Sequence, residues 1–217
     1  MMTIPTTVPG IVDTPPAKDV PPITQAAMAS VSYPVPIFGW DALIFAVIIR
    51  AATPVKIPEG VTVTHITSAD QIGNIWDGTE GQYYVLDNDI TLDENYMNFC
   101  EFNGVLDGQG HTVTFKDSQG LFSRVGESGV VQNIAFKGTI GNVWENTGVL
   151  GGSIKGAVLN CSVEISGSDA CGFAKKLSGG VIANSIAFGE SPSGALFAQY
   201  EDVNGAGLVK NCYWLDT

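Results

Sequence analysis

Two aspartates that share a place in a repeated pattern could carry chemistry in this chain. Asp87 lies in YVLDN (84–88) and Asp107 in GVLDG (104–108), each one residue before the end of its pattern. If the two stretches stack in register, the carboxylates lie about 5 Å apart, the separation that retaining glycosidases use. Because Ca²⁺ prefers oxygen ligands, the same pair could also begin a calcium site.

The surrounding sequence favours a structural role for both aspartates. Aspartate is common beside turns because its side chain hydrogen-bonds the local backbone. Later copies of the pattern carry non-acidic residues at this position: Gln132, Leu159, Ala183 and Lys210. No acidic groove therefore continues along the repeat. We expect no catalytic residues, and Asp87 and Asp107 are kept as a candidate cation site.

Histidine and cysteine give no second catalytic or metal-binding pattern. His65 and His111 have no nucleophile signature around them, and no helix pattern follows the GQG at 108–110, which therefore is not a dinucleotide fingerprint. The cysteines stand at 100, 161, 171 and 212 without any CxxC pair. We expect free, buried thiols, no metal and no cofactor.

The composition argues against nucleic acid and membrane as partners. The formal net charge is −12, and only 10 Lys and Arg residues are spread along 217 positions. Such a surface repels phosphate backbones and anionic lipid. Residues 42–49 (ALIFAVII) are strongly apolar but are flanked by Asp41 and Arg50, so the run is too short to span a bilayer.

A pentapeptide pattern recurs through the second half of the chain. GVVQN (129–133), GAVLN (156–160), GVIAN (180–184) and GLVKN (207–211) share the template Gly, apolar, Val or Ile, any residue, Asn. The two aspartate-containing stretches are looser copies. The last positions of the six copies form the predicted ladder: Asn88, Gly108, Asn133, Asn160, Asn184 and Asn211.

Successive ladder positions are 20, 25, 27, 24 and 27 residues apart, which is typical of a solenoid coil with three short strands. Asparagine and glycine suit a tight corner with a left-handed backbone, and stacked asparagines can hydrogen-bond from coil to coil. Two residues before each ladder position stands an aliphatic residue, which predicts a core column. The sequence thus predicts an all-β, right-handed parallel β-helix of about six coils over residues 60–217.

The N-terminal quarter has a different composition. Eight of the eleven prolines fall within residues 1–36, which predicts an extended arm that is ordered only against another surface. Residues 37–59 are predicted to cap the open end of the solenoid or to lie in a subunit interface. The residues expected to make that contact are Phe38, Trp40, Leu43, Ile44, Phe45, Val47 and Ile48.

Residues 62–217 resemble the GLUG-type repeats of parallel β-helix proteins. The resemblance rests on ITSADQIGNIWDGTEGQYYVLDNDITL (66–92), FNGVLDGQGHTVTF (102–115), GLF with GVVQNIAF (120–136) and the closing NCYW (211–214). Such repeats occur in bacterial adhesin-like surface proteins and in viral or phage structural proteins. The resemblance implies that residues 62–217 form a scaffold. The proline-rich arm of this chain has no counterpart in those repeats.

We therefore expect a non-enzymatic structural protein of a virus or phage particle. A capsid-decorating or cementing subunit, or a tail or fibre component, fits a solenoid with an arm and without a basic, apolar secretion signal at MMTIPTTVPG. Expected partners are other virion proteins and further copies of the chain, by analogy three. The alternatives are a β-helix polysaccharide lyase or glycosidase, and a carbohydrate-binding adhesin at a cell surface.

Overall fold

The computed structural model describes residues 58–76, 79–141, 148–166, 171–188, 198–201 and 207–215, with only the backbone at 198–201 and 214–215. The predicted arm (1–36) lies outside this range, as does the predicted cap or interface segment apart from its last two residues. The same is true of every residue expected to make the cap contact: Phe38, Trp40, Leu43, Ile44, Phe45, Val47 and Ile48.

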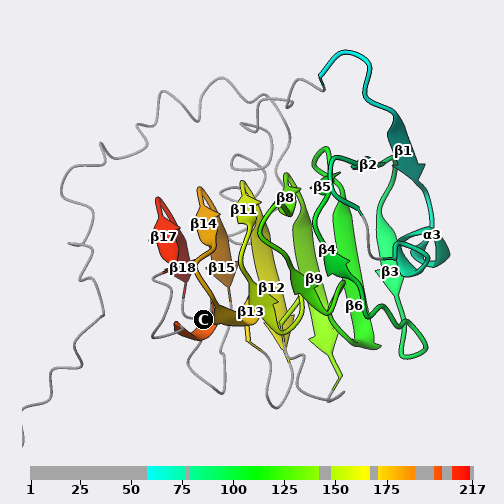
Figure 1. Cartoon of the computed structure of the whole chain (residues 1–217). Coiled ribbons are helices and arrows are strands. Elements are labelled where there is room, and N and C mark those ends of the chain that lie inside the picture. The colour runs from blue at the N-terminus through cyan, green and yellow to red at the C-terminus, as the bar shows by residue number, and fades with distance from the viewer. Residues whose placement is uncertain are drawn as a thin grey trace, which may run out of the picture. The chain divides into compact units, whose positions relative to one another are not determined.

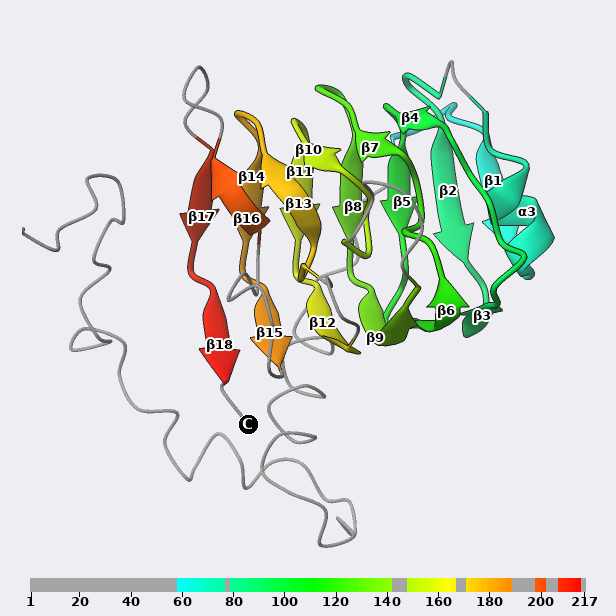
Figure 2. The same cartoon turned by 90° about the horizontal axis from the view of Figure 1, so that it is seen from below.

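The described residues form a parallel β-solenoid of about five turns, which confirms the predicted fold class (Figure 1). All the strand pairings among them are parallel, and the strands of each turn belong to three different sheets. The predicted number of about six coils is one too many, because the six ladder positions enclose only five turns. Figure 2 shows successive strands of each sheet side by side in chain order.

The three sheets are named A, B and C. Sheet A contains β1 (Val63–Ile66), β2 (Tyr83–Leu86), β5 (Val105–Asp107), β8 (Val130–Gln132), β11 (Ala157–Leu159), β14 (Val181–Ala183) and β17 (Leu208–Lys210). Sheet B contains β3 (Ile90–Leu92), β6 (Thr112–Ser118), β9 (Ala135–Ile140), β12 (Ser162–Ser166), β15 (Ile186–Phe188) and β18 (Tyr213–Leu215). Sheet C contains β4 (Glu101–Phe102), β7 (Arg124–Val125), β10 (Ser153–Ile154), β13 (Ala174–Leu177) and β16 (Ala198–Glu201).

One short helix, α3 (Ala69–Gly73), lies between β1 and β2 at the N-terminal end of the described solenoid. It begins after Ser68, whose backbone N–H donates to Oε1 of Gln71 at 3.2 Å, as in a capping box. Ile72 is fully buried. The amide of Asn98 donates to the carbonyls of Ile72 and Ile75 at 2.9 and 3.1 Å, which fixes the end of the helix to the loop before β4.

The core column predicted from the repeat is confirmed on five strands of sheet A. Leu106 pairs with Val131, and the column continues through Val158 and Ile182 to Val209. Its first four members are completely buried, whereas Val209 on the last strand is 37% exposed because no described strand pairs beyond it.

The register predicted for the first turn is wrong by two residues. Leu106 pairs with Tyr84, not with Leu86, which lies opposite Ile66 of β1. Leu86 is nevertheless fully buried. Both Tyr84 and Leu86 are core residues, so the apolar pattern alone does not distinguish the two registers.

Aromatic rings fill much of the rest of the core, and glycines allow neighbouring coils to approach closely. Phe102 stacks on Phe122 with ring centroids 4.4 Å apart and planes 5° from parallel. Glycine opens GLF (120–122) and GVL (148–150), the stretches before β7 and β10, because the coils approach closely there. A Cβ on Gly148 would lie against backbone atoms of Phe173 and Ala174 in the next turn.

Candidate functional site

The polar residues of the repeat lie at the corner between sheet A and sheet B, and this corner changes length along the solenoid. The strand bounds leave two corner residues in each of the last four turns: 133–134, 160–161, 184–185 and 211–212. They leave three residues in the first corner (87–89) and four in the second (108–111). The first two corners are therefore built differently from the others.

Four ladder asparagines have the predicted left-handed backbone. Their φ angles are 57° at Asn133, 54° at Asn160, 51° at Asn184 and 53° at Asn211. A tight two-residue corner needs one left-handed residue, and asparagine tolerates that conformation better than other side chains with a Cβ.

Asn88 and Gly108 do not have this conformation, which corrects the prediction for the first two ladder positions. In the second corner the left-handed residues are Gln109 (φ 50°) and Gly110 (φ 87°). The extra residues in this corner shift the left-handed backbone conformation from position 108 to the two residues after it. Gly108 is small for another reason, since a Cβ there would lie against Asn133 and Ile134.

Hydrogen bonds between stacked side chains run along the ladder in one direction. Asn211 Nδ2 donates to Asn184 Oδ1 at 3.2 Å, and Asn160 Nδ2 donates to Asn133 Oδ1 at 3.2 Å. Asn133 Nδ2 donates in turn to Oδ1 of Asp107 at 3.0 Å. The predicted coil-to-coil bonding is confirmed at these steps, and the carboxylate of Asp107 accepts the bond at the N-terminal end.

Asp107 is a buried structural acceptor. Only 9% exposed, it also accepts from the backbone N–H of Gln109 at 2.9 Å and from Nε2 of Gln132 at 3.2 Å. Its partner in β2 is Val85, not Asp87. The stacked carboxylate pair that motivated a glycosidase or calcium site is therefore not formed by register.

Asp87 lies on the surface in a pair with a histidine. Its two carboxylate oxygens lie 2.9 and 3.1 Å from Nδ1 of His65, with both side chains well exposed. A similar pair joins Asp89 to His111 at 3.3 Å. Asp89 also accepts from the backbone N–H of Thr112, and this bond, followed by the one with His111, lowers the pKa of the Asp89 carboxyl.

Within the described residues, no group of three His, Cys, Asp or Glu side chains could hold a metal ion. The candidate cation site at Asp87 and Asp107 thus gains no support from the geometry. His65 and His111 each have an aspartate partner, which the sequence did not indicate.

The cysteines are free and mostly buried, as predicted. Cys161 donates to the carbonyl of Leu159 at 3.2 Å, and Ser185 makes the same bond to Ala183 at 2.9 Å one turn later. Cys212 repeats it with Lys210 at 3.3 Å. Burial raises the pKa of the Cys161 thiol to about 12, so this sulfur is a small core group and not a nucleophile.

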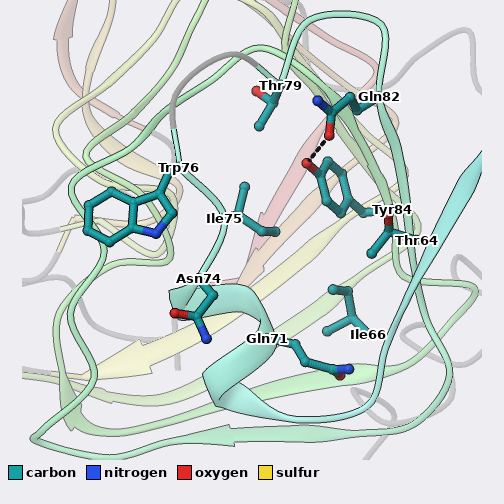
Figure 3. A pocket seen from close by; sticks show the side chains of 9 residues that line it. All are labelled: Thr64, Ile66, Gln71, Asn74, Ile75, Trp76, Thr79, Gln82 and Tyr84. Atoms are coloured by element: carbon teal, nitrogen blue, oxygen red, sulfur yellow. Dashed lines mark hydrogen bonds between the residues drawn. The ribbon is translucent and has the colours of Figure 1, made fainter.

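A pocket of about 440 Å³ opens at the N-terminal mouth of the solenoid, where sequence analysis predicted no site (Figure 3). It lies between β1, the segment from α3 to Trp76, and the start of β2. The lining residues are uncharged: Thr64, Ile66, Gln71, Asn74, Ile75, Trp76, Thr79, Gln82 and Tyr84. Burial raises the pKa of Tyr84, and its hydroxyl donates to Gln82 Oε1 at 2.7 Å.

The outward-facing side of sheet A carries a row of apolar side chains. These residues alternate with the buried core column and therefore point away from the core. Directly paired along the sheet, they are partly exposed, and we call them the outer row of sheet A: Val63, Tyr83, Val105, Val130, Ala157, Val181 and Leu208.

No helix in the described part of the chain is long and apolar enough to cross a membrane. Comparison with protein-family models, with curated proteins and with solved structures finds no match to this chain.

Proposed function

We propose that this protein is a non-enzymatic structural subunit of a virus or phage particle that assembles through the outer row of sheet A. The subunit would decorate or cement the capsid. The solenoid supplies a rigid surface, and the proline-rich arm (1–36) would bind neighbouring virion proteins.

The observation that carries this proposal is the contrast between two sheets of the same solenoid. On sheet A the outer row is apolar over seven consecutive strands. On sheet B the corresponding row begins with Thr91, Thr114, Lys137 and Glu164 before Phe188 follows. A sheet that faces water on one side normally carries polar residues there, as the first four strands of this sheet-B row do. A continuous apolar row is typical of a surface that another chain covers.

Three further features support the same proposal. The repeat resembles GLUG-type repeats, which occur in viral and phage structural proteins. The chain has few charged residues, 15% in all, which suits a protein with much of its surface in contacts. The apolar residues 42–49 would add to the interface between copies of the chain. The expected assembly is a trimer.

The polysaccharide lyase or glycosidase alternative depended on Asp87 stacked over Asp107. The register places Val85 opposite Asp107, so that alternative loses the pair on which it was based.

The proposal is tested by the oligomeric state of the full-length chain at micromolar concentration. We expect an oligomer in light-scattering chromatography and native mass spectrometry. Val130→Asp places a charge in the centre of the outer row and should give a folded monomer. Thr114→Asp on the outward side of sheet B is the matched control and should leave the oligomer unchanged.

Circular dichroism of both variants shows whether the solenoid is intact. A wild-type chain that is monomeric at these concentrations would overturn the proposal. So would a Val130→Asp variant that assembles as well as the Thr114→Asp control.

A further inference from the structure

We propose that the pocket at the N-terminal mouth of the solenoid binds a neutral carbohydrate, with Trp76 as the stacking platform. This inference is independent of the assembly proposed above, because the outer row of sheet A contributes none of the nine lining residues. Its failure would leave the assembly proposal intact.

The position of the pocket follows from the way in which the first turn is built. Each later strand of sheet A pairs with a strand of the preceding turn, whereas no described strand precedes β1. At the first turn, helix α3 and the segment after it cover the core, and they do not fill the space beside Ile66 and Tyr84. About 440 Å³ remains, which lies within the range of roughly 300–1,000 Å³ that small-ligand sites occupy.

Trp76 is the side chain that most clearly points to a ligand. It lies at one side of the pocket, while Tyr84 lies at the other (Figure 3). Trp76 is 68% exposed, although tryptophan is among the side chains that gain most from burial. The negative face of an indole attracts the weakly positive C–H groups of a sugar ring, so an exposed tryptophan at a pocket suits a pyranose.

The polar groups around Trp76 match the hydroxyl groups of a sugar. Gln71 uses its Oε1 as an acceptor from Thr67 and Ser68, and its NH₂ makes no hydrogen bond to the described residues. The side-chain amide of Asn74 and the hydroxyl of Thr64 likewise have no hydrogen-bond partner among the described residues, whereas the backbone N–H of Asn74 donates to the carbonyl of Asp70. An amide and a hydroxyl can each donate and accept, as sugar hydroxyls do.

The lack of charged residues in the described lining favours neutral sugars over charged ones. All nine described lining residues are uncharged, and the whole chain carries a formal charge of −12. An anionic ligand would find no cation in this lining and a repulsive field around it. A neutral mono- or disaccharide has the polarity and the apolar ring face that the pocket offers.

The test uses the full-length chain and a panel of neutral disaccharides: cellobiose, chitobiose, maltose and lactose. Saturation-transfer NMR should show contact with at least one member, and calorimetry should give a Kd on the order of 0.1–1 mM. Trp76→Ala should weaken binding about tenfold or more. Trp76→Phe, which keeps an aromatic face, should retain part of the affinity.

Phe99→Ala is the matched control, because Phe99 is an aromatic residue of similar exposure (61%) that is not among the lining residues. It should bind as the wild type does. The inference is overturned if no member of the panel shows saturation transfer, or if Trp76→Ala binds as tightly as Phe99→Ala. Tighter binding of a uronic-acid disaccharide than of the neutral sugars also overturns it.

Discussion

Replacing Asn133 by glycine isolates the contribution of the asparagine ladder to stability. Glycine accepts the φ of 57° at this corner, so the substitution removes the side chain without forcing the backbone to change. The side chain that is lost is 3% exposed and hydrogen-bonds on both sides, to Asp107 and to Asn160.

The expected loss can be estimated from those two bonds. The bond to the Asp107 carboxylate is 3.0 Å long, and a hydrogen bond to a charged group contributes about 1.5–3 kcal/mol. The bond from Asn160 is neutral and contributes about 0.5–1.5 kcal/mol. Asp107 keeps its bonds from Gln109 and Gln132, so its charge is not left unpaired. We expect the loss of these two bonds in Asn133→Gly to lower the free energy of unfolding by about 2–4 kcal/mol.

Asn211→Gly is the matched control. Asn211 has nearly the same φ, 53°, but it is exposed on the last turn and donates only to Asn184. The entropic cost of introducing glycine, roughly 0.5–1 kcal/mol, is common to both variants. Each variant also loses one neutral amide bond, so the difference between them should be about 1.5–3 kcal/mol, which reports the buried bond to the Asp107 carboxylate.

Urea unfolding of the full-length variants, followed by circular dichroism, measures both losses. The slopes must be equal for the comparison to hold, because a solenoid can unfold in parts. If Asn133→Gly costs no more than Asn211→Gly, the stacked amides do not stabilise the solenoid. The recurring asparagine would then serve the backbone conformation alone.

Two further predictions concern the close packing of the coils. Gly156→Ala should cost about 3 kcal/mol in urea unfolding, because its Cβ would meet the carbonyl oxygens of Gly129 and Gly126; Gly179→Ala, with φ of +83° and open space, should cost only about 1–2 kcal/mol, and equal losses would contradict close approach as the reason for the glycine. Native protein at pH 8 should show one thiol that reacts faster than the others towards a disulfide reagent, the half-buried Cys212, because Cys100, Cys161 and Cys171 are buried; since burial also raises the pKa of Cys212, it should react more slowly than a free thiol. Rapid labelling in the Cys212→Ser variant would contradict this.

The repeat in the sequence predicted most of the solenoid, since each turn must meet the same local demands. A left-handed corner recurs in every turn from Asn133 onward, and the aliphatic residue two positions earlier is buried in each of these turns except the last. These are local requirements, and the residue types that satisfy them are few. The core column and four of the six ladder positions therefore followed from the pattern.

The strand register of the first turn could not be predicted from the sequence, because a slip of two residues preserves the apolar pattern. A slip of one residue moves every side chain to the other face of a strand, but a slip of two keeps each side chain on its own face. Tyr84 and Leu86 are both buried and both apolar, so either could stand opposite Leu106. The extra residues in the first two corners decide the register, and a pentapeptide template does not count them.

The pocket and the outer row differ in what the sequence revealed of them. The pocket is lined by residues from three short stretches between Thr64 and Tyr84, and no motif joins them. The outer row was already present in the template, because its second and third positions are both apolar. Consecutive residues of a strand face opposite sides, so two adjacent apolar positions predict an apolar surface as well as an apolar core.

The direction of the ladder explains why an aspartate, and not a fifth asparagine, stands at its N-terminal end. In each hydrogen bond described above, the amide N–H₂ points towards the preceding turn. An asparagine at position 107 would point an N–H₂ group at the first turn, where Val85 lies opposite and offers no side-chain acceptor. A carboxylate only accepts, and so it ends the row without an unpaired buried donor. At the C-terminal end of the ladder, Asn211 is exposed, so a further donor could reach its Oδ1. At its N-terminal end the ladder therefore stops at a carboxylate that can only accept. At its C-terminal end it stops because no described strand of sheet A follows β17.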